Sequence, residues 1–163
     1  MKPYNRPTLQ QLIEQGLVFA TRGYQAAVAG QYAYGMLWNA AGSGKNFYVF
    51  AANVNPTASA GIVCGYRSTT IGAVLATAVS RNLYLGRADG SAQMYFGTNA
   101  TLTTILPDNQ HLANRGVINS ESGEFDAGGA GVVVPPGFGL IVRLDVLAVG
   151  INLSVLHAEV PAS

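Results

Sequence analysis

Few residues in this chain have the types and spacing that chemistry requires. His157 and Glu159 are two residues apart in a segment of alternating hydrophobicity, so both side chains fall on one face of a predicted strand. A histidine and a carboxylate on one face could bind a metal or transfer a proton, but two groups do not complete a zinc site. The other histidine, His111, falls in a predicted loop. We therefore interpret His157 and Glu159 as a structural pair or an interface pair.

Residues 41–46, AGSGKN, are similar to a phosphate-binding loop only in part. Asn39 stands where that loop has its first glycine, and Asn46 stands where Ser or Thr binds magnesium. The segment also lies between two predicted strands, so no helix N-terminus faces a phosphate there. We predict an ordinary β-turn.

Cysteine and acidic residues also provide no site. Cys64 is the single cysteine, so it forms no disulfide within the chain, and its apolar neighbours predict a small buried side chain. Glu121, Glu124 and Asp126 precede Gly128-Gly129 in a spacing that matches no established calcium loop, which indicates a solvated or partner-facing loop. No set of nucleophile, base and acid emerges. We predict that the chain is not an enzyme and uses no cofactor or metal.

Tyr32, Tyr34, Met36 and Trp38 share one face of a predicted strand. Such a stripe would form a platform for stacking sugars if it were exposed, and is part of the core if it is buried. We favour the core, and a carbohydrate-binding β-sandwich module remains an alternative.

The low charge of the chain is its strongest compositional signal. Only 17 of 163 residues are charged, about 10 %, where an ordinary domain carries roughly 25 %. No run of apolar residues is long enough to cross a bilayer. We therefore expect other copies, or another protein, to cover part of the surface. The basic residues form no cluster, which predicts no nucleic-acid partner, and we expect no membrane partner either.

The cations and acids are divided unevenly along the chain. Residues 1–88 hold seven Lys or Arg against Glu14, a net charge of +6. Residues 89–163 hold Arg115 and Arg143 against seven acids, a net charge of −5. This asymmetry could support head-to-tail contacts between subunits, but we favour a fold that interleaves the two halves. The basic N-terminus lacks the apolar stretch of a secretory signal, so we expect the protein to stay in the cytoplasm or wherever its assembly goes.

The first element that the sequence predicts is a short helix over about residues 8–19. Thr8 and Gln11 form a capping box. A stripe at helical spacing follows, and we predict that it contacts a neighbouring protein; its residues are Leu9, Leu12, Ile13 and Leu17. We place this helix in an N-terminal arm over residues 1–30.

From residue 31 to 163 the pattern predicts one all-β domain, an antiparallel β-sandwich or jelly roll. The predicted strands are residues 31–38, 46–54, 61–67, 70–77, 82–88, 92–97, 101–106, 131–134, 138–149 and 151–160. The strand at 46–54 is apolar on both faces, which predicts cover on both sides. Tyr48 and Phe50 share one of its faces, and we predict that they form a subunit interface.

Two hairpins are predicted between these strands. Asp89-Gly90 is a strong turn signal that would pair 82–88 with 92–97. Val149-Gly150 would close the second hairpin, pairing 138–149 with 151–160.

The C-terminal pattern resembles a known family. Residues 132–144, VVVPPGFGLIVRL, and 151–159, INLSVLHAE, look like the closing hairpin of small jelly-roll proteins on tailed-bacteriophage particles. The resemblance rests on about 30 residues with a motif, and on the strand pattern elsewhere. It implies a non-enzymatic virion protein: a capsid cement or decoration protein that forms homotrimers, is made in the host cytoplasm and binds the major capsid protein on the outer capsid surface. On this resemblance, the arm would contact the capsid or a neighbouring subunit through Leu9, Leu12, Ile13 and Leu17. A tail, baseplate or receptor-binding component is an alternative, and a trimeric signalling jelly roll is disfavoured by the missing secretory signal.

Overall fold

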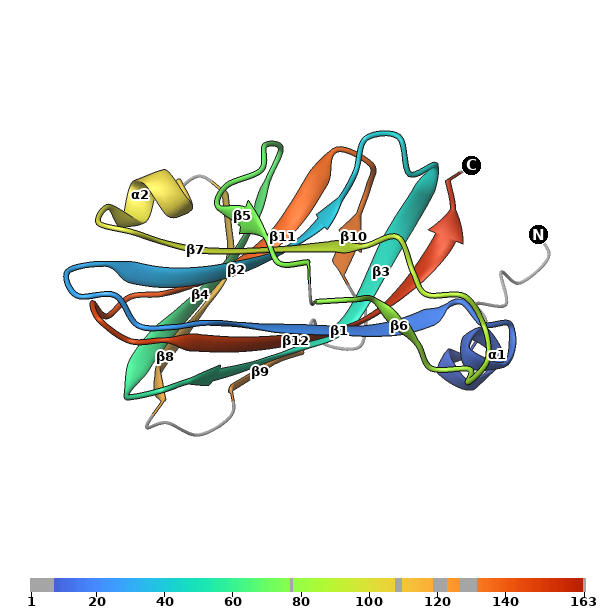
Figure 1. Cartoon of the computed structure of the whole chain (residues 1–163), viewed down its shortest axis with the longest axis horizontal. Helices are drawn as coiled ribbons and strands as arrows, with labels where there is room; N and C mark the ends of the chain where they lie inside the picture. The colour runs from blue at the N-terminus through green and yellow to red at the C-terminus, as the bar shows by residue number, and fades with distance from the viewer. Residues whose placement is uncertain (1–7, 77, 108–109, 119–122, 127–131, 163) are drawn as a thin grey trace, which may run out of the picture.

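The fold is an antiparallel β-sandwich of two packed sheets (Figure 1). It is known from a computed structural model that describes residues 8–162 except 77, 108–109, 119–122 and 127–131. In this described part, each sheet has six strands. The first sheet has the order β10 (Val132–Val134), β3 (Lys45–Pro56), β12 (Ile151–Pro161), β1 (Val18–Gln25) and β6 (Arg81–Asn82), and β9 (Gly123–Asp126) also pairs with β3. The second has the order β5 (Ala73–Val74), β7 (Gln93–Asn99), β2 (Tyr32–Asn39), β11 (Phe138–Leu144), β4 (Ala60–Arg67) and β8 (His111–Ile118). The all-β prediction is confirmed.

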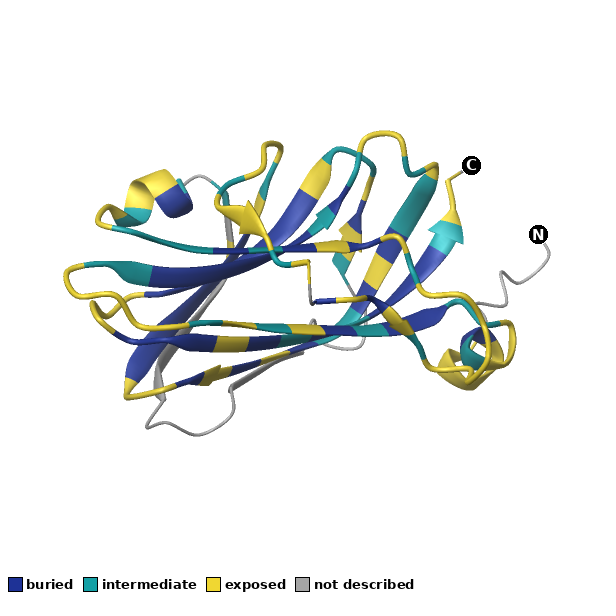
Figure 2. Cartoon of the chain, in the orientation of Figure 1, coloured by how far each residue is buried: buried dark blue, intermediate teal, exposed yellow. Residues whose placement is uncertain are grey.

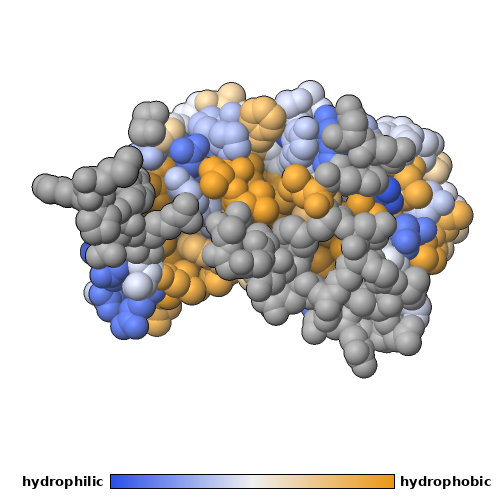
Figure 3. Space-filling view, turned by 180° about the vertical axis from the view of Figure 1, so that it is seen from behind, coloured by the Kyte–Doolittle hydropathy of each residue, from blue (hydrophilic) through white to orange (hydrophobic). Residues whose placement is uncertain are grey.

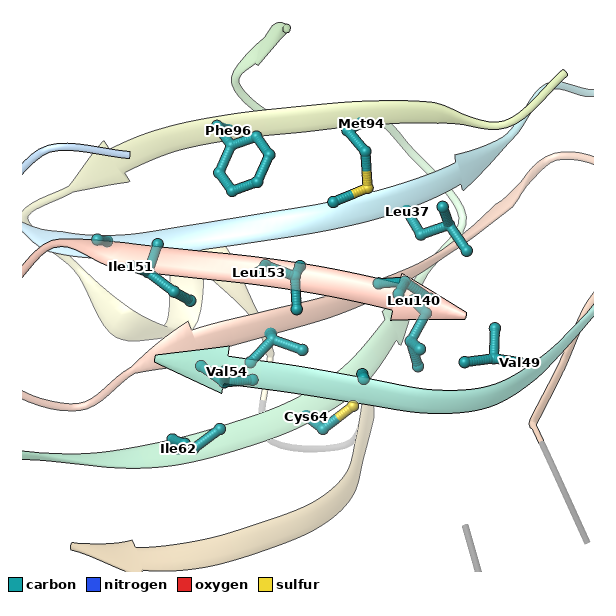
Figure 4. Close-up of a cluster of buried hydrophobic side chains, with 14 of the residues drawn as sticks. Leu37, Val49, Val54, Ile62, Cys64, Met94, Phe96, Leu140, Ile151 and Leu153 are labelled. Atoms are coloured by element: carbon teal, nitrogen blue, oxygen red, sulfur yellow. The ribbon is translucent and has the colours of Figure 1, made fainter. Parts of the chain in front are cut away.

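The core lies between the two sheets, where the inward-facing side chains of both meet (Figures 2 and 4). Leu153 from the first sheet and Leu140 from the second are both fully buried there. Along β12 the buried residues alternate with more exposed ones from Ile151 to Val155, as expected for a strand with one face in the core.

The helix at the N-terminus, α1, spans Leu9–Glu14 and begins at the predicted capping box. It is shorter than predicted because Gly16 adopts a φ of +71° and terminates it. The amide of Gly16 donates to the Ile13 carbonyl and that of Leu17 to the Leu12 carbonyl, a Schellman motif. The chain then enters β1, which lies between β12 and β6. Residues 18–25 of the expected arm therefore belong to the sandwich.

The first predicted hairpin is wrong. Residues 82–88 do not pair with 92–97: β6 pairs with β1, and β7 pairs with β2 and β5. Gly90 does not form a hairpin turn. It lies so close to Glu159 that a Cβ at this position would overlap the carboxylate, which is why a glycine is needed there.

The second predicted hairpin is also wrong, since its two strands lie in different sheets. β11 belongs to the second sheet and β12 to the first, so residues 145–150 cross from one sheet to the other. Asp145 holds this crossing in place, because its Oδ1 accepts a hydrogen bond of 2.6 Å from the Gly61 amide.

Three shorter segments also differ from the prediction. Residues 102–105 form a helical turn, α2 (Leu102–Ile105), in place of a strand. Only Ala73 and Val74 of the predicted strand 70–77 form one, β5. His111, predicted in a loop, begins strand β8.

Candidate interaction surfaces and a buried polar network

Glu159 is the centre of a buried polar network at one end of the core. Its side chain is 0 % exposed and accepts hydrogen bonds from the Ser91 amide (2.7 Å), the Ser91 hydroxyl (2.7 Å), the Ala92 amide (3.0 Å) and Lys45 Nζ (2.8 Å). Burial by itself would raise the pKa of this carboxyl. The hydrogen bonds from His157, Lys45, Ser91 and Ala92 outweigh burial and lower the pKa to about 2.

His157 lies beside Glu159, between the rings of Phe19 and Phe47 at centroid distances of 5.9 and 5.3 Å. Its Nε2 is 3.4 Å from Ser80 Oγ and 3.5 Å from Glu159 Oε1. In a catalytic triad the hydroxyl and the carboxylate face opposite ring nitrogens, whereas here both face Nε2. Ser80 is also 1 % exposed, so no substrate reaches it. The arrangement is suited to joining strands, as the structural interpretation expects.

The segment similar to a phosphate-binding loop is a turn, as predicted. The Ser43 amide donates to the Ala40 carbonyl, and Gly44 adopts a φ of +63°. The turn delivers Lys45 to Glu159, so its ammonium group faces a carboxylate of the same chain.

Cys64 is buried in the core, as predicted, and burial raises the pKa of its thiol to about 12. In the part of the chain that the structure describes, no three His, Cys, Asp or Glu side chains gather in a way that could hold a metal ion. Glu121 lies outside the described residues, and Glu124 and Asp126 lie on β9.

The aromatic stripe lies on the outer face of the second sheet. Tyr34 and Met36 are buried there in a cluster with Ile105 of α2, and burial raises the pKa of Tyr34, an effect that the Arg67 guanidinium opposes. Tyr32 and Trp38 are partly buried against the same cluster. Half of the stripe is therefore core, and the stripe does not present one open platform.

The predicted arm residues have two different environments. Leu12 is buried in a cluster with Val18 and Ala158 on the outer face of the first sheet, and Ile13 and Leu17 pack against that cluster. Leu9 is 40 % exposed. Leu12 is thus covered by its own chain, Ile13 and Leu17 are partly covered, and Leu9 is the most exposed of the four. A contact with a capsid or a neighbour remains a prediction.

The two predicted interface residues, Tyr48 and Phe50, also lie in different environments. His157 pairs with Val49 and Leu156 with Ala51, so Phe50 has no partner on β12 and the face pattern of β3 shifts at that residue. Phe50 packs against the cluster beneath α1. Tyr48 is 38 % exposed and lies beside Val133 of β10, which remains consistent with an interface role.

Sequence reasoning missed an apolar cleft of about 230 Å³ beside Val133. It lies between β10 of the first sheet and strands β4, β8 and β11 of the second, and is lined by Tyr66, Leu112, Val132, Val133, Val134, Pro135, Phe138, Gly139 and Leu140. Seen from behind, the molecule shows hydrophobic surface near its middle (Figure 3).

The geometry of the second sheet explains why these side chains form a cleft. Tyr66 is paired with Leu140, whose side chain is in the core, and Phe138 precedes Leu140 by two residues. Tyr66 and Phe138 thus point to the core side but remain 39 % and 36 % exposed. The only signal in the sequence was the position of Phe138 directly after Pro135-Pro136-Gly137.

A second apolar surface surrounds α1. The loop after β6 is held against the helix end, because Asn82 Nδ2 donates to the Gly16 carbonyl and the Leu83 amide donates to the Val18 carbonyl (Figure 1). We call three consecutive exposed apolar residues of this loop the tip: Leu83, Tyr84 and Leu85. Leu85 is 89 % exposed, the highest value among the exposed large hydrophobic residues that the structure describes.

Comparison with known proteins identifies no relative. No family model, no curated protein and no solved structure matches this chain. Among the described helices, neither is long and apolar enough to span a membrane.

Proposed function

We propose that this chain is a non-enzymatic virion structural protein, a capsid cement protein that binds the outer capsid surface as a homotrimer. The observation that carries the proposal is the apolar surface left uncovered in a chain with few charges. Among the residues that the structure describes, fifteen large hydrophobic ones are at least 36 % exposed, and several of them line the cleft or belong to the tip. Exposed patches of this kind are typical of surfaces that other proteins cover.

The proposed action is mechanical. A subunit that buries ~800 Å² against the shell and its neighbours would gain most of its gross binding energy from apolar area, at ~25 cal/mol per Å² before ordering costs. A trimer attaches through three such contacts, and all three must open before it dissociates. Bridging neighbouring capsid subunits in this way would raise the force or temperature at which the shell opens.

Immunogold labelling of virus particles with an antibody to this protein tests the proposal. Label distributed over the heads supports the cement role. Label confined to the tail would replace it with tail assembly or receptor binding. Absence of label from purified particles would overturn a virion role altogether.

A binding assay with isolated capsids then tests the predicted arm contact. The matched variants are Leu9→Ser at the exposed side of α1 and Leu147→Ser in the distant β11–β12 crossing, since the two leucines are 40 % and 44 % exposed. We expect Leu9→Ser to reduce co-sedimentation with capsids at least fivefold, and Leu147→Ser to leave it unchanged. Equal binding of both variants would show that the arm is not the contact. Deleting residues 1–20 is unsuitable, because it removes the start of β1.

A further inference from the structure

We infer that the tip of one subunit inserts Leu85 into the apolar cleft of a second copy of this chain. This inference rests on the proposed function in one respect, that the chain forms an oligomer, and it names the contact that builds it. Because Leu85 and the cleft lie at different places on one surface, the contact is head-to-tail. Such a contact closes into a ring when the rotation between subunits allows it.

Leu85, which we call the knob, is left almost uncovered by its own chain. It stands at the end of a loop, 89 % exposed, between Tyr84 and Gly86. The loop is braced from behind: Asn82 bonds to Gly16 and Ala88 carbonyls, and Arg87 lies over the Tyr84 ring at 5.3 Å. A braced apolar side chain loses little conformational freedom when it binds, which favours association.

The cleft has the size and lining that a leucine needs. Its volume of about 230 Å³ exceeds that of one leucine side chain, and its walls are apolar residues from both sheets. Because Val134 and Leu140 of its lining belong to the core cluster, a side chain that enters the cleft extends the core of the second subunit.

The two surfaces also match in area. A large apolar residue presents ~200 Å² when fully exposed. The cleft side, at 36–49 % exposure, therefore offers roughly 400 Å² from Tyr48, Tyr66, Leu112, Val133 and Phe138. The tip, at 39–89 % exposure, offers roughly 340 Å². A stable interface buries about 800 Å² per partner, of which somewhat more than half is apolar, so each surface supplies most of the apolar area that one partner buries.

Sedimentation velocity of the full chain over a range of concentrations tests the contact. We expect the wild-type protein to associate, and both Leu85→Lys and Leu112→Glu to weaken association at least tenfold. The matched control is Leu147→Lys, whose leucine is as exposed as Leu112 but lies in the β11–β12 crossing. A monomeric wild-type protein, or equal loss of association in Leu147→Lys, would overturn the inference.

Mixing the two charged variants gives a sharper test. The Leu112→Glu protein retains an intact knob and the Leu85→Lys protein an intact cleft, so a mixture is expected to form heterodimers although neither forms oligomers alone. A cysteine pair, Leu85→Cys with Leu112→Cys, is expected to form disulfides between subunits under mild oxidation, because the proposed contact brings the two positions together. Native Cys64 is buried and does not compete. A mixture that stays monomeric would overturn the inference. These measurements need no virus particle. The subunit contact can therefore be confirmed even if the protein does not bind capsids, and capsid binding can be confirmed even if this contact is absent.

Discussion

At the scale of single residues, Glu159 is the most consequential side chain of the described core. It connects Lys45 at the start of β3, Ser91 and Ala92 before β7, and His157 on its own strand. A buried carboxylate with this many donors is stable only while they remain in place. The network therefore joins the end of β12 to two other segments of the chain.

Replacing Glu159 with Gln is expected to lower the free energy of unfolding by about 3 kcal/mol, because one carboxylate oxygen becomes an NH2 group that cannot accept a hydrogen bond. Either Lys45 and the Ser91 hydroxyl, or the Ser91 and Ala92 amides, then lose their acceptor. Urea unfolding monitored by circular dichroism measures the change. The matched control is Asp89→Asn, which breaks an ion pair with Arg81 whose side chains are 39 % and 71 % exposed, and is expected to cost less than 1 kcal/mol. Equal costs for the two variants would contradict the role of Glu159.

The same carboxyl predicts a pH dependence of stability. Its pKa falls from an ordinary value of 4.5 to about 2 on folding, so between these values the unfolded chain binds more protons than the folded one. The stabilisation is fully present above about pH 4.5 and is lost as the pH falls through 2. The wild-type protein is expected to lose about 3 kcal/mol more than Glu159→Gln between pH 5 and pH 2. Parallel pH profiles for the two proteins would exclude this contribution.

At the scale of elements, close packing between strands is decided by glycines. Phe96 of β7 faces Gly35 of β2 and reaches Gly23 of β1, so its ring fills the space between the two sheets. A Cβ at Gly35 would lie 2.7 Å from the ring, and one at Gly23 would overlap it. The missing side chains are what allow β1 and β7 to approach.

Gly23→Ala is therefore expected to destabilise the protein by about 2 kcal/mol through overpacking. Phe96→Leu in the same chain should recover part of that loss, since the smaller side chain leaves room for the methyl group, and a double-mutant cycle measures the coupling. Gly42→Ala is the control, because a Cβ there meets nothing within 4 Å. Additive effects of Gly23→Ala and Phe96→Leu would show that the ring does not set the spacing.

At the scale of the whole molecule, the strand order mixes the two halves of the chain. β12 lies between β1 and β3, and β11 lies between β2 and β4. The basic first half and the acidic second half are thus interleaved, as favoured from the sequence, and Lys45 and Glu159 form an ion pair across the division. The interleaving leaves no large-scale separation of charge between the two halves, so the proposed assembly rests on the apolar surfaces at the tip and the cleft.

The sequence by itself determined the features that depend on neighbouring residues. The alternation of apolar residues predicts an all-β chain because side chains on a strand point to opposite faces in turn, and Thr8 and Gln11 mark the start of α1 because a capping box lies within one turn. The burial of Cys64 and the turn at residues 41–44 follow from equally local signals.

Only the tertiary structure decided which strands pair. Asp89-Gly90 and Val149-Gly150 carry turn signals, yet the strands around them pair elsewhere, because each gains more by covering the core from its own sheet than by pairing with its neighbour in sequence. Apart from His157, the donors to Glu159 come from segments 67 to 114 residues away, and the cleft is built from four strands of both sheets. Such distant contacts leave no local pattern, because the alternation of apolar and polar residues along a strand does not indicate which strand will pair with it.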